Sequence, residues 1–186
     1  ERDKNNPSIV MWSLGNEVDE ADGGERSLET AKRLKAVIKA IDTERYVTMG
    51  ENKFSNRSTG EFLKLAAIMD AVGMNYGERN YDAVRRAHPD WLIYGSETSS
   101  ATRTRDSYFD PAHLLSHDNR RNRHYEQSDY GNDRVGWGRT ATESWTFDRD
   151  RAGYAGQFIW TGFDYIGEPT PWHNQDNTPV KSSFFG

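Results

Sequence analysis

The chain has 186 residues, a net charge of −5 and no cysteine, and 28% of its residues are charged while 34% are hydrophobic. This length suffices for one domain with its own core, and the composition is that of a polar globular protein without a membrane span. The acidic balance argues against a nucleic-acid partner, and the lack of cysteine excludes disulfides, thiolate zinc sites and a cysteine nucleophile.

Five short apolar runs predict strands, and they are nearly continuous rather than alternating. They cover residues 9–12, 46–49, 71–74, 91–94 and 157–160. Runs of this kind are typical of strands buried on both faces, as in parallel sheets.

Helical patterns lie between these runs. Apolar residues recur at helical spacing over 26–41, a capping-box pattern at 58–61 opens a second helix, and 80–87 and 140–154 predict two more. The polar stretch 98–135 predicts a long excursion with some helix near 111–126. Alternating strands and helices indicate right-handed βαβ units and a parallel sheet.

Two architectures are compatible with such a sheet at this point, an open doubly wound sheet and a closed barrel. No Gly-x-Gly-x-x-Gly pattern follows the first predicted strand, so a dinucleotide site is not supported. Polar side chains do follow the strands' carboxyl ends, which in a barrel meet on the face that holds the active site. These residues are Asn16, Glu17, Glu51, Asn52, Asn75, Tyr76, Glu97 and Asp164.

Glu17 and Glu97 each come directly after a predicted buried strand. Retaining glycoside hydrolysis needs two carboxyls that face each other across a sugar. One protonates the leaving oxygen and later deprotonates water, while the other attacks the anomeric carbon. Either residue alone is more often an ordinary loop glutamate, so the interpretation depends on the pair. Tyr76 fits it, because a tyrosine hydroxyl can orient and stabilise the nucleophile.

Three motifs in a fixed order carry a family resemblance. Asn-Asn-Pro-Ser-Ile-Val-Met-Trp-Ser-Leu-Gly-Asn-Glu at 5–17 resembles the acid/base segment of glycoside hydrolase family 2. Tyr-Gly-Ser-Glu-Thr at 94–98 resembles its nucleophile segment, and 156–171 resembles the last barrel strand and following loop of bacterial β-galactosidases. The resemblance extends over residues 5–186.

This resemblance implies an α/β fold in which residues 1–186 form a single fragment of a (β/α)8 TIM barrel, roughly strands four to eight. It implies that Glu17 is the acid/base and Glu97 the nucleophile. Asn16 would bind the sugar 2-hydroxyl, Tyr76 would contact the nucleophile, and Trp160 would lie under the galactose ring.

Further substrate contacts are expected from loops. Glu51 and Asn52 after the fifth barrel strand are candidates, and the alternative is that this pair faces solvent. The others follow the last strand and are Asp164, Trp172, Asn174 and Lys181.

No metal site is predicted from the residues. His113 and His117 are four apart, but no third ligand motif accompanies them. Some family members carry a histidine three residues after the nucleophile, where this chain has Ser100. No cofactor is therefore assigned, and a divalent or sodium ion in the parent enzyme is left open.

The activity that the resemblance implies is retaining hydrolysis of terminal β-D-galactosides. β-Glucuronidase and β-mannosidase are alternatives within the family, and segments 168–172 and 181–186 favour the galactoside. A different alternative is a catalytically silent half-barrel, because a five-strand arc leaves two sheet edges unpaired. The expected partners are thus a β-galactoside and either the missing barrel half or a second copy. The compartment is open between bacterial cytoplasm, secretion and the cell surface.

Overall fold

The computed structural model describes residues 2–18, 25–54, 60–101, 106, 108, 129–131, 134 and 136–162, which form parts of two compact units. One unit comprises residues 1–97 and 151–157, and the other comprises 98–150 and 158–186. Both candidate carboxylates belong to the first unit.

The strands form a five-stranded sheet in the order β1-β2-β3-β4-β5. They are β1 (Met11–Asn16), β2 (Tyr46–Glu51), β3 (Ala71–Asn75), β4 (Ile93–Ser99) and β5 (Tyr154–Trp160). The pairs β1/β2, β2/β3 and β3/β4 are parallel, as predicted. Sequence neighbours are sheet neighbours throughout, which is the order of a barrel wall. A doubly wound sheet instead reverses its strand order at a switch point.

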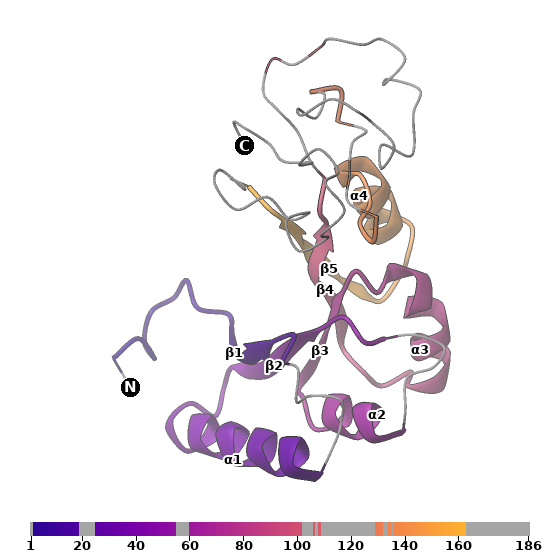
Figure 1. The fold of residues 1–186 in the computed structure, drawn as a ribbon. Helices are drawn as coiled ribbons and strands as arrows, with labels where there is room; N and C mark the ends of the chain where they lie inside the picture. The colour runs from indigo at the N-terminus through magenta and orange to yellow at the C-terminus, as the bar shows by residue number, and fades with distance from the viewer. Residues whose placement is uncertain are drawn as a thin grey trace, which may run out of the picture. The chain divides into compact units, whose positions relative to one another are not determined.

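The helices of the first unit are α1 (Glu25–Ile41), α2 (Gly60–Ala67), η1 (Glu78–Asn80) and α3 (Tyr81–Ala87), and α4 (Ala141–Arg149) belongs to the second. Figure 1 shows α1 and α2 side by side next to strands β1–β3. Within the part of the chain that the structure describes, no helix is long and apolar enough to cross a membrane.

Helix α4 is shorter than the sequence pattern predicted. It begins with a capping box in which the Thr140 hydroxyl accepts from the Glu143 amide and the Glu143 carboxylate accepts from the Thr140 amide. It ends at Arg149, and Gly153 at φ +85° turns the chain into β5. The predicted helix extended to residue 154 because hydrophobic spacing alone does not show that Gly153 has a left-handed backbone conformation. The capping residue predicted at 58 and the helix predicted near 111–126 lie outside the described residues.

The core lies where β2 faces the helices. Met49 packs with Ala31 of α1 and Leu65 of α2, and Leu14, Leu28, Ile68 and Met69 surround them. All of β3 is buried, and so is β2 after Tyr46, as predicted for strands covered on both faces. The prediction was wrong for β1 and β5, which are only partly buried because each ends the strand order and has one neighbour.

The other face of β2 and its neighbours carries small and polar residues. The Thr48 hydroxyl lies 2.8 Å from the Ala71 carbonyl, to which it donates, and 3.0 Å from the Tyr94 hydroxyl. Towards the carboxyl ends, Gly50 and Gly73 follow on this face. A Cβ at Gly50 would lie 2.7 Å from Asn16 Oδ1, and one at Gly73 would lie 2.7 Å from Ser96 Oγ. The missing side chains therefore leave room for a polar layer.

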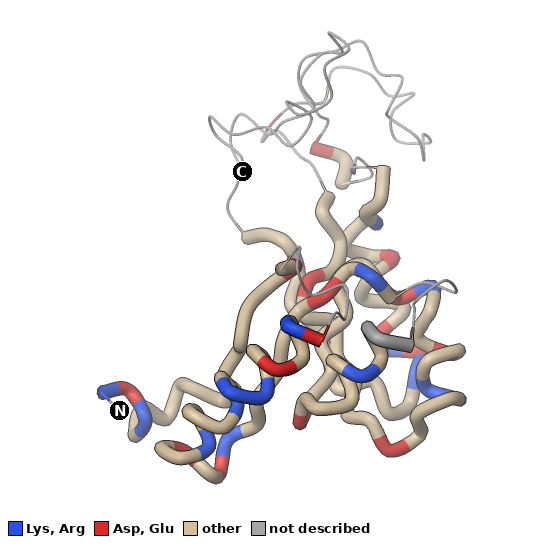
Figure 2. Tube along the Cα trace, turned by 60° about the horizontal axis from the view of Figure 1, so that its bottom comes forward, with Lys and Arg blue, Asp and Glu red and all other residues tan. Residues whose placement is uncertain are grey.

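An ion-pair cluster ties α1 to the sheet. Acidic and basic residues are interspersed along the first unit (Figure 2), and Asp70 receives hydrogen bonds from two lysines of α1. Lys35 Nζ lies 2.5 Å from Asp70 Oδ1, and Lys39 Nζ lies 2.8 Å from Oδ2. The Val47 amide also donates to Oδ2 at 2.9 Å. Partial burial acts to raise the pKa of Asp70, but these donors outweigh it and lower the pKa to about 2.

Protonating Asp70 is expected to loosen α1. The pKa is lower in the folded chain than the ordinary 3.8, so the stabilisation is present above pH 4 and is lost as the pH falls towards 2. Urea unfolding across this range should show a loss of roughly 1–2 kcal/mol for the wild type, allowing for solvent screening. Asp70→Asn should remove that part of the pH dependence, whereas the exposed Asp90→Asn should not. An unchanged slope in Asp70→Asn would contradict this.

Candidate active site

The two carboxylates stand at the carboxyl ends of their strands and are held there by backbone hydrogen bonds. Glu17 directly follows β1, and its amide donates to the Gly50 carbonyl of β2 at 2.9 Å. Glu97 lies near the end of β4, and its carbonyl accepts from the Tyr76 amide, just after β3, at 2.8 Å. The ends of four parallel strands are thus linked in two pairs around one site.

Two residues at this site have left-handed backbone conformations. Glu17 has φ +46° and Tyr76 has φ +50°. Such values cost a residue other than glycine about 1–3 kcal/mol, and they persist only where the surrounding fold imposes them. Each of these residues is the first after a strand, Glu17 after β1 and Tyr76 after β3. At this position the backbone conformation sets the direction of the side chain relative to the strand ends.

A hydrogen-bond network joins the two carboxylates to their neighbours. The Tyr76 hydroxyl donates to Glu97 Oε1 at 2.6 Å. The Asn75 amide group donates at 2.8 Å both to Glu17 Oε1 and to Asn16 Oδ1. Short bonds of this type fix side-chain direction, because charged acceptors give stronger and shorter hydrogen bonds than neutral ones.

The charge of Glu17 is felt at Glu97. Burial raises the pKa of the Glu97 carboxyl most, the Tyr76 hydroxyl lowers it, the Glu17 charge raises it again, and the Asn16 side chain lowers it by a hydrogen bond. The net effect is a pKa above the ordinary 4.5. A carboxyl whose charge raises the pKa of a second carboxyl is an arrangement suited to a shared acid, base and nucleophile site.

Comparison with known proteins decides the family. The description "Glycosyl hydrolases family 2, TIM barrel domain" applies to the family model that matches residues 1–168. The chain belongs to glycosyl hydrolase family 2. The resemblance of the three motifs is confirmed, and the sheet is part of the family's TIM barrel.

Named relatives and solved structures agree with this membership. The chain is 33% identical over its whole length to a β-galactosidase, BoGH2A, from Bacteroides ovatus, and spans 25% of that protein. A family 2 structure from Bacteroides cellulosilyticus is 28% identical with a TM-score of 0.60, covering 91% of this chain and 17% of that one. A β-galacturonidase structure from Eisenbergiella tayi shares the fold at a TM-score of 0.64 and 17% identity, covering 97% of this chain and 30% of that one.

In this family 2 barrel, the structure places the sequence-predicted site residues unequally. Asn16, Glu17, Tyr76 and Glu97 are brought together by the network at the strand ends. Asn52 is exposed just after β2 and takes no part in this network among the described residues.

The remaining predicted site residues belong to the second unit by residue number. Trp160 ends β5 with 41% of its surface exposed, its carbonyl accepts from the Ser100 amide at 2.9 Å, and the following peptide bond to Thr161 is cis. Asp164, Trp172, Asn174 and Lys181 lie outside the described residues. Over the described ranges, no group of three His, Cys, Asp or Glu side chains is placed to hold a metal ion.

Sequence reasoning assigned no role to Asn75 or Ser96. Asn75 was recognised only as a polar residue at a strand end, and Ser96 only as part of a motif. Strand alternation carries no signal for Ser96, which follows the large Tyr94 on one face of β4. It does carry one for Asn75, which shares a face of β3 with Gly73. A small residue two positions before a polar one indicates a side chain that turns inwards into a narrow space.

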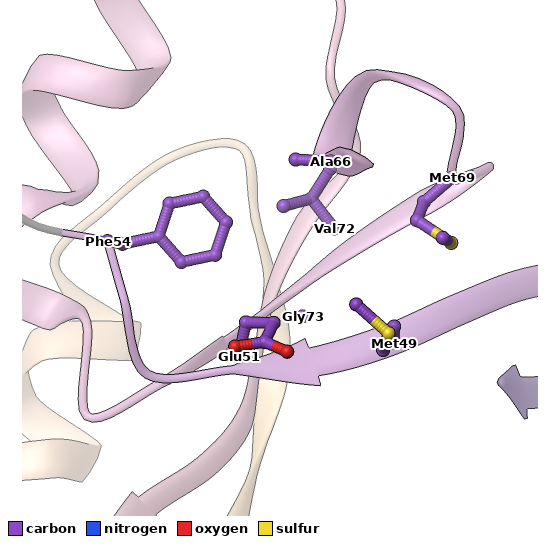
Figure 3. Close-up of a pocket in the computed structure, with 7 residues that line it drawn as sticks. All are labelled: Met49, Glu51, Phe54, Ala66, Met69, Val72 and Gly73. Carbon is purple, nitrogen blue, oxygen red and sulfur yellow. The ribbon is translucent and has the colours of Figure 1, made fainter. Parts of the chain in front are cut away.

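Glu51 lies in an apolar cavity rather than in solvent. Only 2% of it is exposed, and Figure 3 shows its carboxylate among Met49, Phe54 and Val72. The cavity has a volume of about 10 Å³, roughly the room for one water molecule. Neither oxygen has a hydrogen-bond partner of normal geometry among the described residues. The solvent-facing alternative is therefore wrong for Glu51, because strand alternation directs it to the Met49 side of β2.

The protonation of Glu51 is expected to govern stability near neutral pH. Burial raises its pKa to about 7, opposed by the Lys53 charge, increased by the Glu17 charge, and lowered slightly by the Val18 and Asn52 amides. The folded pKa exceeds the ordinary 4.5, so the unfolded chain loses the proton first. Stability should therefore be greatest below pH 4.5 for this group and should decline as the pH rises to 7.

Glu51→Gln should remove that decline, since glutamine keeps the shape without the charge. At pH 8 the variant is expected to be more stable than the wild type by on the order of 2–3 kcal/mol. Guanidinium unfolding at pH 4 and pH 8 measures the difference, with the exposed Glu44→Gln as the matched control. A Glu51→Gln variant that is less stable than the wild type at pH 8 would show that the carboxylate is paired.

Proposed function

We propose that this barrel segment carries the machinery for retaining hydrolysis of a terminal β-D-galactoside, with Glu17 as acid/base and Glu97 as nucleophile. The observation that carries the proposal is the pair of carboxylates at the carboxyl ends of β1 and β4, each oriented by its own donor. Tyr76 bonds Glu97 at 2.6 Å, and Asn75 bonds Glu17 at 2.8 Å. Two carboxyls with separate hydrogen-bond environments can hold separate roles.

The chemistry would proceed in two displacements. Glu97 attacks the anomeric carbon while the bond to the leaving oxygen breaks, and Glu17 gives that oxygen its proton. Glu17 then takes a proton from water as the water attacks the glycosyl-enzyme and releases Glu97. The Asn16 side chain, beside both carboxyls, would bond the sugar 2-hydroxyl, an interaction that strengthens in the transition state.

A galactoside is the substrate that we favour among the sugars of this family. The relative that is 33% identical over the whole chain is named a β-galactosidase. Glucuronides, mannosides and galacturonides are competing substrates, and a galacturonidase of this family shares the fold. These sugars differ at C2, C4 or C6, so the choice depends on pocket residues rather than on the two carboxylates.

Assembly is part of the proposal, because the chain spans about a quarter of the β-galactosidase that it matches. Three apolar side chains near the start of the chain are exposed. Val10, just before β1, is 68% exposed, Val37 of α1 is 61% exposed, and Tyr46, the first residue of β2, is 50% exposed. We propose that these residues pack against further barrel elements or a second copy. Without such a partner, the chain would be the silent half-barrel.

The test is hydrolysis of nitrophenyl β-galactoside, β-glucuronide, β-mannoside and β-galacturonide by this chain, with Glu97→Gln as the blank. Galactoside turnover that disappears in the variant supports the proposal. Turnover that survives Glu97→Gln overturns the nucleophile assignment. Faster hydrolysis of another sugar would make that sugar the proposed substrate in place of the galactoside. Absence of all turnover rejects the activity for this chain, and light scattering then measures whether it self-associates.

A further inference from the structure

Asn75 is the most constrained polar side chain of the site. It is the last residue of β3 and is 0% exposed. Both hydrogens of its amide group are used, one on Asn16 Oδ1 and one on Glu17 Oε1, each at 2.8 Å. Its carbonyl oxygen accepts from the Ser96 hydroxyl at 2.5 Å. Exchanging the amide oxygen and nitrogen would place the oxygen against two acceptors, so the hydrogen bonds allow this side chain one orientation.

The network has a direction that begins at Ser96. A hydroxyl donor directed at Asn75 Oδ1 forces the Asn75 amide hydrogens towards Asn16 and Glu17. Asn16 Oδ1 is then occupied, so the Asn16 amide hydrogens are the ones that reach Glu97, whose carboxyl receives a hydrogen bond from that side chain. Through this sequence of bonds, one buried amide orients groups at both carboxyls.

The backbone leaves space for this arrangement and for little else. A Cβ on Gly50 would lie 2.7 Å from Asn16 Oδ1 and 3.0 Å from Asn75 Oδ1. A Cβ on Gly73 would lie 2.7 Å from Ser96 Oγ. The backbone at Gly50 and Gly73, on adjacent strands, therefore packs directly against the network. The amide groups cannot shift towards these glycines when a neighbouring residue is changed.

We infer that Asn75 is a positioning residue for the acid/base step, holding the Glu17 carboxyl towards the leaving oxygen and the Asn16 amide towards the sugar. This rests on the proposed function of Glu17 and Glu97. Asn75 itself is 0% exposed and both of its amide hydrogens are used, so it does not contact a substrate directly. Its effect must therefore appear in steps that need a proton from Glu17, and only weakly in steps that do not.

The first test compares substrates that differ in their need for a proton. Asn75→Ala is expected to lower the turnover of phenyl β-galactoside by about 10²-fold, the lower end of general acid catalysis. Dinitrophenyl β-galactoside, whose leaving group departs without a proton, should lose far less. Thr48→Val is the matched control, since it removes a buried hydroxyl one layer below on the same face. It should lower the melting temperature while affecting both substrates equally.

If Asn75→Ala lowers the turnover of both substrates equally, Asn75 has only a structural role. If it lowers the turnover of neither substrate, the inference is wrong. Ser96→Ala should reproduce the same selectivity in weaker form, because it releases the orientation of the Asn75 amide without removing it. An unselective Ser96→Ala would contradict the direction of the network.

A second measurement does not depend on turnover. In ¹⁵N-labelled protein at pH 7, the side-chain amide protons of Asn75 are expected to change their chemical shift in Glu17→Gln, which replaces the carboxyl acceptor by an amide. The exposed Glu44→Gln should leave them unmoved. A chain that hydrolyses neither galactoside fails the proposed function, and the Asn75 resonance still decides the inference. A resonance indifferent to Glu17→Gln would overturn it.

Discussion

Glu97→Gln is expected to lower the turnover of an aryl β-galactoside by roughly 10⁴-fold or more, the scale of losing a covalent nucleophile. Glutamine preserves the shape at the end of β4 and can still accept from the Tyr76 hydroxyl, whose oxygen lies 2.6 Å from Glu97 Oε1. It cannot form a stable glycosyl ester. Initial rates with nitrophenyl galactoside measure the loss, and circular dichroism shows whether the fold is kept.

A trapping experiment identifies the residue directly. A 2-deoxy-2-fluoro-galactoside with a dinitrophenyl leaving group should glycosylate the wild type, and peptide mass analysis should place the sugar on Glu97. Tyr76→Phe is the matched control, because it removes the donor and keeps the carboxylate. It should be labelled at the same residue but more slowly. A label found on Glu17 would reverse the two roles.

Glu17→Ala is expected to produce the second large effect, about 10²–10⁴-fold on substrates that need a proton for the leaving oxygen. The variant should form the glycosyl-enzyme from dinitrophenyl galactoside and then fail to activate water. Added azide needs no base, so it should restore turnover by attacking the glycosyl-enzyme. Because two inversions give net retention, the product should be β-galactosyl azide, which NMR distinguishes from the α form.

The anomeric form of the azide product separates the assignments. An α-galactosyl azide from Glu17→Ala would mean that azide had displaced the leaving group directly, and that Glu17 is the nucleophile. Glu97→Ala supplies the reciprocal control, because azide should there give the α product. No rescue in either variant, with both folds intact, would argue against a double-displacement mechanism.

The secondary structure of the first unit was largely predictable because it depends on local patterns. The apolar spacing over 26–41 matched α1 to within one residue, and the continuous run at 71–74 became the fully buried β3. Such patterns report which side of a helix or strand is apolar, and that preference acts within a few residues of chain. The expectation that Glu17 and Glu97 stand at the carboxyl ends of strands followed from the same reasoning.

The surroundings of Glu51 could not be predicted in the same way. It ends a strand that is buried from Val47 onwards. Strand alternation puts Glu51 on the same face as Met49, but it does not show what covers that face. Only the packing of β2 against α1 and α2 placed Met49 among apolar side chains and Glu51 in the cavity beside it. The burial that raises the pKa of Glu51 to about 7 is therefore a property of the assembled layers.

By itself, the sequence determined the strand and helix segments, the parallel sheet and the two carboxylates at strand ends. Tertiary structure decided the strand order and the partners of those carboxylates. Asn75 bonds Asn16 across 59 residues and Glu17 across 58, while Ser96 is 21 residues away. Hydrophobic periodicity is local, whereas the choice of a hydrogen-bond partner depends on strand register, on bulges such as the shift between Gly73 and Asn75, and on the space left by two glycines.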